Sequence, residues 1–420
     1  MDKLKEVGIC MVVSEVRNYI SEKILMKMIK GLFIALIFFF PYSISIRETL
    51  IGLLFIFYVL KKLLDWDLFL TKTPFDKEII IYLLFSFMSL FKVNNVLTGF
   101  EEIIVSPFKY MAFFYIAYDL INKEKIVKYL NILFYGSFSF LIIGKVVFHI
   151  TGKNYLGGNG AGTWATFSIF MFIYLLINNE EKYFKKGLAI FGAILGVNVL
   201  FTTNSRGAVL AFAGGLLISL FMLASKKIVN KKRLFAMFFL IITLIIIAIP
   251  FVLPQKLINK FENIKDVNTH WSLKTRVIMW ESSLYNIVRN PILGVGIGDF
   301  QTNYLNYIDN VIEEKVPRGA RIHDHPHNLF LYIAVEQGIM SLIVFLFILF
   351  KSFKICFANF NSFDLHSKEA YLGILLCGML VSLTIHSMVD TTFRYGHVGY
   401  YIMMIIILNL KLNNFKKESV

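Results

Sequence analysis

The sequence predicts an all-α polytopic membrane protein, and three observations carry that prediction. Of the 420 residues, 57% are hydrophobic and only 17% are charged, whereas a water-soluble domain carries about 25% charged residues. The apolar residues also come in blocks long enough to cross the roughly 30 Å hydrocarbon layer of a bilayer. Finally, basic residues gather in alternate connections between these blocks. A water-soluble globular fold is therefore excluded.

The apolar blocks predict about twelve transmembrane helices. Most blocks have no polar face, as expected of helices surrounded by lipid or by other helices. The division between the first two is the weakest, because Pro41 and Arg47 are also compatible with a re-entrant turn. The predicted helices are Gly31–Ile46, Glu48–Leu64, Glu78–Phe91, Ile103–Ile121, Val127–Ile150, Gly162–Ile177, Gly187–Phe201, Ala208–Ala224, Leu234–Leu253, Leu329–Phe350, Ala370–Val389 and Val398–Leu410.

The distribution of basic residues predicts the orientation. The N-terminal stretch and every second connection contain several lysines or arginines, and cytoplasmic loops carry such an excess. Both termini are therefore predicted to be cytoplasmic. The net charge of +15 then reports topology and does not indicate a nucleic-acid partner. Each short connection on the opposite side has one cation, namely Arg47, Lys92, Lys153, Arg206 or Arg394.

The predicted organisation has five segments. A cytoplasmic or interfacial segment (1–30) precedes helices one to nine (31–253), and a large external loop (254–328) precedes helices ten to twelve (329–410) and a cytoplasmic tail (411–420). We expect no cleavable signal peptide, because the N-terminal stretch lacks an apolar core followed by small residues. The external loop is too long for a plain connection, which favours a functional role.

The part of this loop between Thr275 and Gly298 is predicted to contain a helix followed by a turn. Apolar spacing predicts an amphipathic helix over Thr275–Val288, and Asn290-Pro291 predicts its end. The run Gly294–Gly298 superficially resembles a dinucleotide-binding motif, but no βαβ pattern surrounds it. We therefore predict a tight turn that brings the loop against the helix bundle.

The second half of the loop is the basic run Pro317–Asn328, which leads directly into helix ten. It contains His323, His325 and His327, and Pro326 interrupts any regular strand that would place them on one face. Histidine and aspartate are zinc ligands, yet no HExxH motif accompanies them, so we expect a site without a metal. His327, at a helix start on the membrane surface, is a candidate general base.

Two arginines outside this run are candidate anion ligands. Arg206 lies in the turn between helices seven and eight, and Arg276 lies on the amphipathic loop helix. The guanidinium group binds phosphate in a bidentate fashion, although either residue could be an ordinary solvated cation.

Four further polar residues interrupt or end apolar blocks. Lys109 and Lys145 fall inside blocks, so each is expected to face the bundle interior or to extend to the membrane surface. His386 and Asp390 lie with Arg394 at the outer end of helix eleven. They either pair with the loop or are ordinary interfacial residues.

Three motifs in order resemble the O-antigen ligase and polymerase superfamily of bacterial envelope proteins. Ser205-Arg206-Gly207-Ala208 resembles the family's S-R-G-A turn, and Arg276–Phe300 resembles its R…W…NPxxGxGxG segment. His325-Pro326-His327-Asn328, followed by Glu336-Gln337-Gly338, is similar to its H-x-H-N…E-x-G signature. Ser341 stands where ligases have Gly, Thr or Tyr, which is a departure from the ligase pattern.

The resemblance implies a GT-C-like membrane glycosyltransferase in the bacterial inner membrane, with its active site in a periplasmic loop. Such an enzyme uses no metal or cofactor. As an O-antigen ligase it would transfer a glycan from undecaprenyl pyrophosphate to the lipid A core oligosaccharide, with inversion at the anomeric carbon. His327 matches the catalytic histidine, and Arg206 and Arg276 match the arginines that contact the donor. We predict that Arg321 and His325, in the same basic run, also bind substrate.

Two alternatives stay open. A polymerase of the same superfamily would transfer the growing glycan to another lipid-linked glycan acceptor and would need the same arginine and histidine chemistry. A flippase or secondary transporter also has about twelve helices, but transporters usually contain internal repeats. Here the large loop occurs once, and the motif residues gather on one external face.

Overall fold

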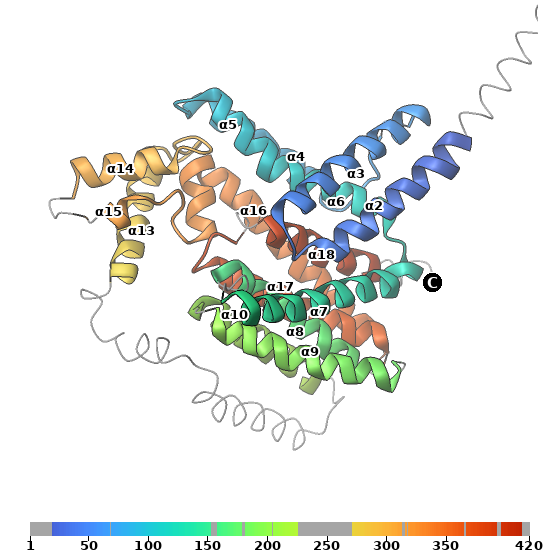
Figure 1. The fold of residues 1–420 in the computed structure, drawn as a ribbon. Helices are drawn as coiled ribbons and strands as arrows, with labels where there is room; N and C mark the ends of the chain where they lie inside the picture. The colour runs from blue at the N-terminus through green and yellow to red at the C-terminus, as the bar shows by residue number, and fades with distance from the viewer. Residues whose placement is uncertain are drawn as a thin grey trace, which may run out of the picture.

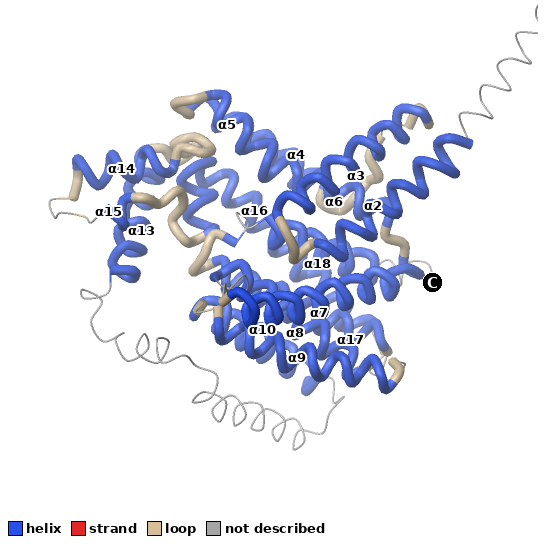
Figure 2. The backbone as a smooth tube through the Cα atoms, in the orientation of Figure 1, coloured by secondary structure: helices blue, strands red, loops and turns tan. Residues whose placement is uncertain are grey.

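The computed structural model describes residues 19–67, 69–152, 158–178, 181–203, 205–225, 271–312, 316, 318–364, 367–392 and 396–413. All regular secondary structure within these residues is helical, so the all-α prediction is confirmed (Figures 1 and 2). The main helices are α2 (Met26–Phe39), α3 (Ile44–Leu64), α4 (Asp76–Met88), α5 (Val96–Ile103), α6 (Lys109–Leu120), α7 (Ile126–Thr151), α8 (Gly158–Ile177), α9 (Tyr183–Thr202), α10 (Arg206–Ser225), α13 (Trp271–Arg289), α14 (Phe300–Asn310), α15 (Arg318–Arg321), α16 (Leu329–Ser362), α17 (Lys368–Ser387) and α18 (Gly396–Asn413).

Several of these helices are membrane spans, which makes the protein a polytopic membrane protein. Among the described residues, seven helical segments are long and apolar enough to cross a bilayer. They are Val96–Leu120, Ile126–Thr151, Gly158–Ile177, Tyr183–Thr202, Arg206–Ser225, Leu329–Ser362 and Lys368–Ser387. The predicted ninth helix, Leu234–Leu253, lies outside the described residues, so the total of twelve stays a prediction.

The helices pack in two groups, which meet at α16 and α18 and also directly where α2 packs on α7. In Figure 1, α7 to α10 lie together with α17, whereas α2 to α6 form the opposite group. Small residues allow the closest approach: a Cβ added at Gly215 of α10 would lie 2.3 Å from the Gly378 carbonyl oxygen of α17. Such small-residue contacts are the usual way in which helices associate in lipid, where apolar burial provides no driving force.

The first two predicted helices are separate elements, whereas the choice between two spans and a re-entrant turn stays a prediction. α2 ends at Phe39 and α3 begins at Ile44, so two separate helices are present. The prediction for Arg47 is wrong, because this residue lies in the first turn of α3 and is buried instead of belonging to the outer connection. Its Nη1 donates to the carbonyl oxygen of Phe40 at 3.3 Å, a group that the end of α2 leaves without a helical partner.

Two other predicted boundaries are also corrected. The fourth predicted helix begins at Val96, and a π-helical segment at Ile104–Phe108 containing Pro107 joins α5 to α6. α16 continues past Phe350 to Ser362, so Lys351, expected in a cytoplasmic connection, lies in the helix. There it forms an ion pair of 2.7 Å with Glu78 of α4, which compensates its charge within the helix packing.

Candidate active site

The described part of the loop that the sequence predicts to be external, from residue 271 onward, forms a small helical layer beside the other helices (Figure 1). Its predicted amphipathic helix is present as α13, which ends at Arg289, directly before the predicted Asn290-Pro291 stop. Ile278 and Met279 on its apolar face pack with Phe300 of α14 and Val335 of α16. Apolar spacing along α13 thus places the loop helix against the start of α16.

The glycine run after α13 is the tight turn that the sequence predicts. Gly294, Gly296 and Gly298 all have positive φ, at 69°, 107° and 87°, a region that residues with a Cβ rarely adopt. The backbone N–H of Gly296 donates to the carbonyl oxygen of Glu336 at 3.0 Å. A Cβ at Gly294 would lie 2.4 Å from the Glu336 carbonyl carbon, so only glycine fits between the turn and α16.

α16 is interrupted where this turn meets it. Gly338 has φ 86° and ψ 168°, which breaks the helix within the Glu336-Gln337-Gly338 motif. The freed N–H of Ile339 donates to the carbonyl oxygen of Pro291 at 2.8 Å. Gln337 is buried and accepts a hydrogen bond of 2.7 Å from Ser86 of α4. The two glycine-containing motifs are therefore the two halves of one junction, which fixes the short first part of α16.

His327 lies directly before this first part of α16. Its Nδ1 donates to Oδ1 of Asp390 at 3.0 Å, although the two residues are 63 positions apart. Asp390 is fully buried and also accepts from the N–H of Thr391 at 2.8 Å. His327 has φ 50°, a left-handed conformation that is costly for a residue with a Cβ and that occurs most often at functional sites.

The charge of Asp390 supports this pairing. Burial alone raises the pKa of the Asp390 carboxyl, but the hydrogen bond from His327 and the nearby His386 and His327 rings bring its pKa below the ordinary value. An ionised carboxylate only accepts hydrogen bonds, so His327 carries its proton on Nδ1. In the neutral form of the imidazole with this tautomer, Nε2 is the atom that can accept a proton, as a general base requires.

The three histidines of the loop converge. The rings of His325 and His327 are 4.3 Å apart, and those of His323 and His327 are 5.9 Å apart. Nδ1 of His325 accepts a hydrogen bond of 3.3 Å from the backbone N–H of His327. Burial and the neighbouring His327 lower the pKa of His323, while Asp324 opposes the shift, so His323 is neutral at neutral pH.

Two motif residues position this histidine segment. Nε1 of Trp280, on α13, donates to the carbonyl oxygen of Pro326 at 2.9 Å. Oδ1 of Asn328 caps the N-terminus of α16, and its Nδ2 donates to the carbonyl oxygen of Met388 at 3.0 Å. The loop helix, the histidine segment and the connection that carries Asp390 are thereby joined.

The arginines predicted from motifs meet the same region to different extents. Arg206 begins α10, where the neighbouring Gly207 packs so closely that a Cβ would lie 2.6 Å from Val389 and 3.1 Å from the His386 ring. Arg276 is close enough to act electrostatically on His386. Arg321 instead forms an ion pair with Asp309 of α14. The predicted roles of all these residues in binding substrate stay predictions.

His325, His327 and Asp390 could also hold a metal ion. Each offers one ligand atom, and these atoms lie within 4.8 Å of one another. Two imidazoles and one carboxylate are a donor set that zinc accepts. The expectation of a site without a metal therefore needs an experimental test.

Sequence reasoning missed the specific partner of His327. Asp390 was noted only as one of several polar residues at the end of helix eleven, and the available signal was a carboxylate directly after an apolar block. It also missed Glu48, which bridges Arg47 and Lys109. Lys109 was expected to face the bundle interior or to reach an edge, and its partner lies in another predicted helix.

The fold and this site together define a class: a polytopic helical membrane protein with a His–Asp pair where the loop before α16 meets the helices. Within the chain, residues 191–346 match the O-antigen ligase family. This match includes Arg206, Arg276 and His327, so the resemblance inferred from the motifs is confirmed, and the chain carries an O-antigen ligase family domain.

Curated relatives agree with this assignment. The chain is 27% identical over 202 residues to a protein of Rickettsia typhi named "Putative polysaccharide ligase", covering 47% of this chain and 48% of the relative. A protein of Rickettsia prowazekii with the same name is 30% identical over 131 residues, covering 30% of each chain. The chain thus spans about half or less of the length of the curated relatives it matches.

Proposed function

We propose that this protein is a membrane glycosyltransferase that moves a glycan from undecaprenyl pyrophosphate to an acceptor at the outer face of the bacterial inner membrane. The observation that carries the proposal is the 3.0 Å His327–Asp390 pair, positioned by the motifs of the O-antigen ligase domain. In the finer assignment the protein has about twelve spans, a GT-C-like architecture and a periplasmic active site, and the acceptor is the lipid A core.

The His–Asp pair supplies the base for the reaction. Asp390 holds the Nδ1 proton of His327, so Nε2 takes the proton from the acceptor hydroxyl as its oxygen attacks the anomeric carbon. The bond from that carbon to the pyrophosphate oxygen breaks at the same time, and undecaprenyl pyrophosphate leaves. A single displacement of this kind inverts the anomeric centre.

Arginines would stabilise the leaving group. Negative charge grows on the pyrophosphate as the glycosidic bond breaks, and preorganised donors in a partly dry site stabilise such charge. The proposed donors are Arg276, which acts electrostatically on His386, and Arg206, whose neighbour Gly207 packs against the His386 ring. His325, beside His327, is a proposed substrate contact, and Arg321 would have to leave Asp309 to become one.

Substitution of His327 tests the proposal. The full chain in lipid nanodiscs is supplied with undecaprenyl-pyrophosphate-linked glycan and lipid A core, and glycan transfer is followed by gel shift. His327→Ala should lower the transfer rate by about 10²–10⁴-fold, the usual contribution of a general base. His149→Ala, which removes an exposed histidine at the end of α7, is the matched control and should transfer normally.

Two results would contradict the proposal. Full transfer by His327→Ala would exclude His327 as the base. Loss of transfer in EDTA, with recovery on added zinc, would replace the metal-free mechanism with one that uses the His325–His327–Asp390 set as ligands.

The same site also suits a polymerase, and Ser341 favours keeping this second candidate. Ser341 is buried and donates to the carbonyl oxygen of Gln337, at the position where ligases carry Gly, Thr or Tyr. The acceptor distinguishes the two functions. A deletion strain that accumulates long glycan on the carrier lipid indicates a ligase, whereas lipid A core bearing one repeat unit indicates a polymerase.

A further inference from the structure

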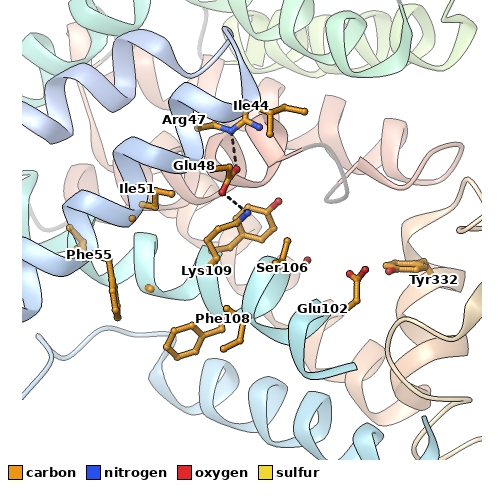
Figure 3. Close-up of a pocket in the computed structure, with 16 residues that line it drawn as sticks. Ile44, Arg47, Glu48, Ile51, Phe55, Glu102, Ser106, Phe108, Lys109 and Tyr332 are labelled. Atoms are coloured by element: carbon orange, nitrogen blue, oxygen red, sulfur yellow. Dashed lines mark hydrogen bonds and ion pairs between the residues drawn. The ribbon is translucent and has the colours of Figure 1, made fainter. Parts of the chain in front are cut away.

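A second site is suggested by a cavity of about 680 Å³ between α3 and the α5–α6 segment, which none of the residues around His327 lines (Figure 3). Much of its wall is apolar and is formed by Ile51, Phe55, Ile104, Val105 and Phe108. Four of these side chains are also open to the surroundings: Phe55, Ile104, Val105 and Phe108 have exposed fractions of 38%, 40%, 56% and 37%. In a membrane protein, such a wall faces lipid.

Three ionisable side chains lie together on this cavity. Glu48 bridges two cations: its Oε1 lies 3.5 Å from Nε of Arg47, and its Oε2 accepts a hydrogen bond of 2.8 Å from Nζ of Lys109 (Figure 3). Arg47 is only 1% exposed, yet it lines the cavity. Two cations share one carboxylate, so the trio keeps one net positive charge.

The trio also has hydrogen-bond donors to spare. A guanidinium group has five N–H donors, and the partners of Arg47 among the described residues are the Phe40 carbonyl and Glu48. An ammonium group has three donors, and Lys109 donates to Glu48. Ionisable residues within membrane helices face the bundle interior or a cavity and often mark a site for a ligand, and all three members of this trio line a cavity.

The helix that carries Lys109 is deformed along the same wall. The π-helical segment Ile104–Phe108, with Pro107 inside it, ends directly before Lys109 and supplies several of the lining residues. π-helical turns are rare and occur frequently at functional sites, because they shift side chains from their regular register. Glu102 lies at the other end of the cavity, apart from the trio and nearer to Tyr332 of α16 (Figure 3).

We infer that this cavity binds the phosphate end of a membrane lipid. The phosphate oxygens accept hydrogen bonds from Arg47 and Lys109, which offer charge-assisted donors suited to a phosphate. The hydrocarbon chain lies along the apolar wall and leaves between α3 and α5 into the bilayer. A free phosphate ion would gain nothing from the apolar wall, and an uncharged lipid would gain nothing from the cations.

Gly52 allows a test that leaves the charged trio intact. Gly52 lines the cavity from α3, and a Cβ added there meets no atom within 4 Å, so Gly52→Phe fills the cavity without a steric clash at Cβ. Gly31 of α2 is the matched control: it is exposed, helical and equally open, but it is not on the cavity wall.

Lipid binding to the purified full chain is measured by native mass spectrometry with dioleoyl phosphatidic acid, dioleoylglycerol, which has the same acyl chains but no phosphate, and inorganic phosphate. We expect phosphatidic acid to bind at least about tenfold more tightly than dioleoylglycerol, corresponding to roughly 1.4 kcal/mol. Gly52→Phe should weaken phosphatidic acid binding about tenfold, whereas Gly31→Phe should bind as the wild type does.

Three outcomes would overturn the inference. Equal binding of both lipids would mean that the cations do not recognise phosphate. Unchanged binding by Gly52→Phe would place the lipid elsewhere, and displacement of the lipid by millimolar inorganic phosphate alone would make a free anion the ligand. The inference does not rest on glycosyl transfer, because binding is measured without any reaction.

Discussion

Two clusters of ionisable residues lie on this helical membrane protein, and they differ in how they are held. The His327 cluster joins a loop segment to the connection after α17, with a half-buried histidine donating to a fully buried carboxylate. The Arg47–Glu48–Lys109 trio joins two helices and lines a cavity in the membrane region. The first arrangement positions an imidazole beside a carboxylate, whereas the second positions two cations and their shared carboxylate on a cavity wall. The two clusters therefore have different proposed roles: glycosyl transfer at His327 and Asp390, and lipid binding at Arg47 and Lys109.

The largest effect in this comparison is expected from Asp390→Asn. The amide cannot accept the Nδ1 proton of His327 as an ionised carboxylate does, so the wrong tautomer and orientation of the imidazole become populated. We expect the transfer rate to fall by about 10- to 100-fold, a part of what general-base catalysis supplies. Binding of phosphatidic acid should not change, and a parallel loss of both would mean that the two clusters are coupled.

The same variant has a consequence for stability at acidic pH. The pKa of Asp390 is lowered in the folded protein, so its ionisation stabilises the fold above the unfolded-state pKa. That contribution is lost as the pH falls through the folded pKa, and Asp390→Asn lacks it. Thermal unfolding between neutral pH and about pH 3 should therefore show a steeper acid loss for the wild type than for the variant. Equal slopes would contradict the ionised state of Asp390.

Glu48→Gln should give the next largest effect, now in the second cluster. Breaking a buried ion pair costs about 3–5 kcal/mol, and because Glu48 is 33% exposed, we expect about 1–2 kcal/mol here. The two cations then lack their shared carboxylate, so phosphatidic acid should bind more tightly while the unfolding temperature falls. A variant that was less stable and also bound the lipid more weakly would show that Glu48 itself shapes the site.

Trp280→Phe should give the smallest effect. It removes the hydrogen bond from Nε1 to the Pro326 carbonyl but retains an aromatic ring. The loss of one such bond costs about 1 kcal/mol, so we expect transfer to fall by a fewfold because the histidine segment is less well positioned. The transfer rate measured beside lipid binding checks this. Weakened lipid binding with normal transfer would be the opposite of what we expect.

Local features of the fold followed from the sequence to a large extent. The apolar blocks, the amphipathic helix α13 and its end before Asn290-Pro291 depend on residues within a few positions of each other. Boundaries were less accurate: the fourth predicted helix begins earlier, at Val96, because the π-helical segment joins α5 to α6, and Arg47 lies within α3. A helix can accept such residues when other elements satisfy their charges and backbone groups, which local patterns do not report.

The candidate site was predictable in its parts but not in its arrangement. Sequence motifs pointed to His327 and to the glycine run as parts of the candidate site, because the types and spacing of these residues are visible in the sequence. The tight turn followed from its glycines, but its docking against a break at Gly338 did not.

By itself, the sequence determined that this is a helical membrane protein and that the stretch before Leu329 forms an amphipathic helix and a glycine turn, because hydrophobicity and helix periodicity are local properties. Only the tertiary structure decided that His327 meets Asp390 and that Glu48 joins Arg47 to Lys109. Each contact links segments far apart in the chain and forms only after the helices pack. The physical reason is that a buried charge is costly unless an opposite charge or a hydrogen-bond partner lies beside it. Which groups become buried together is decided only when the helices pack.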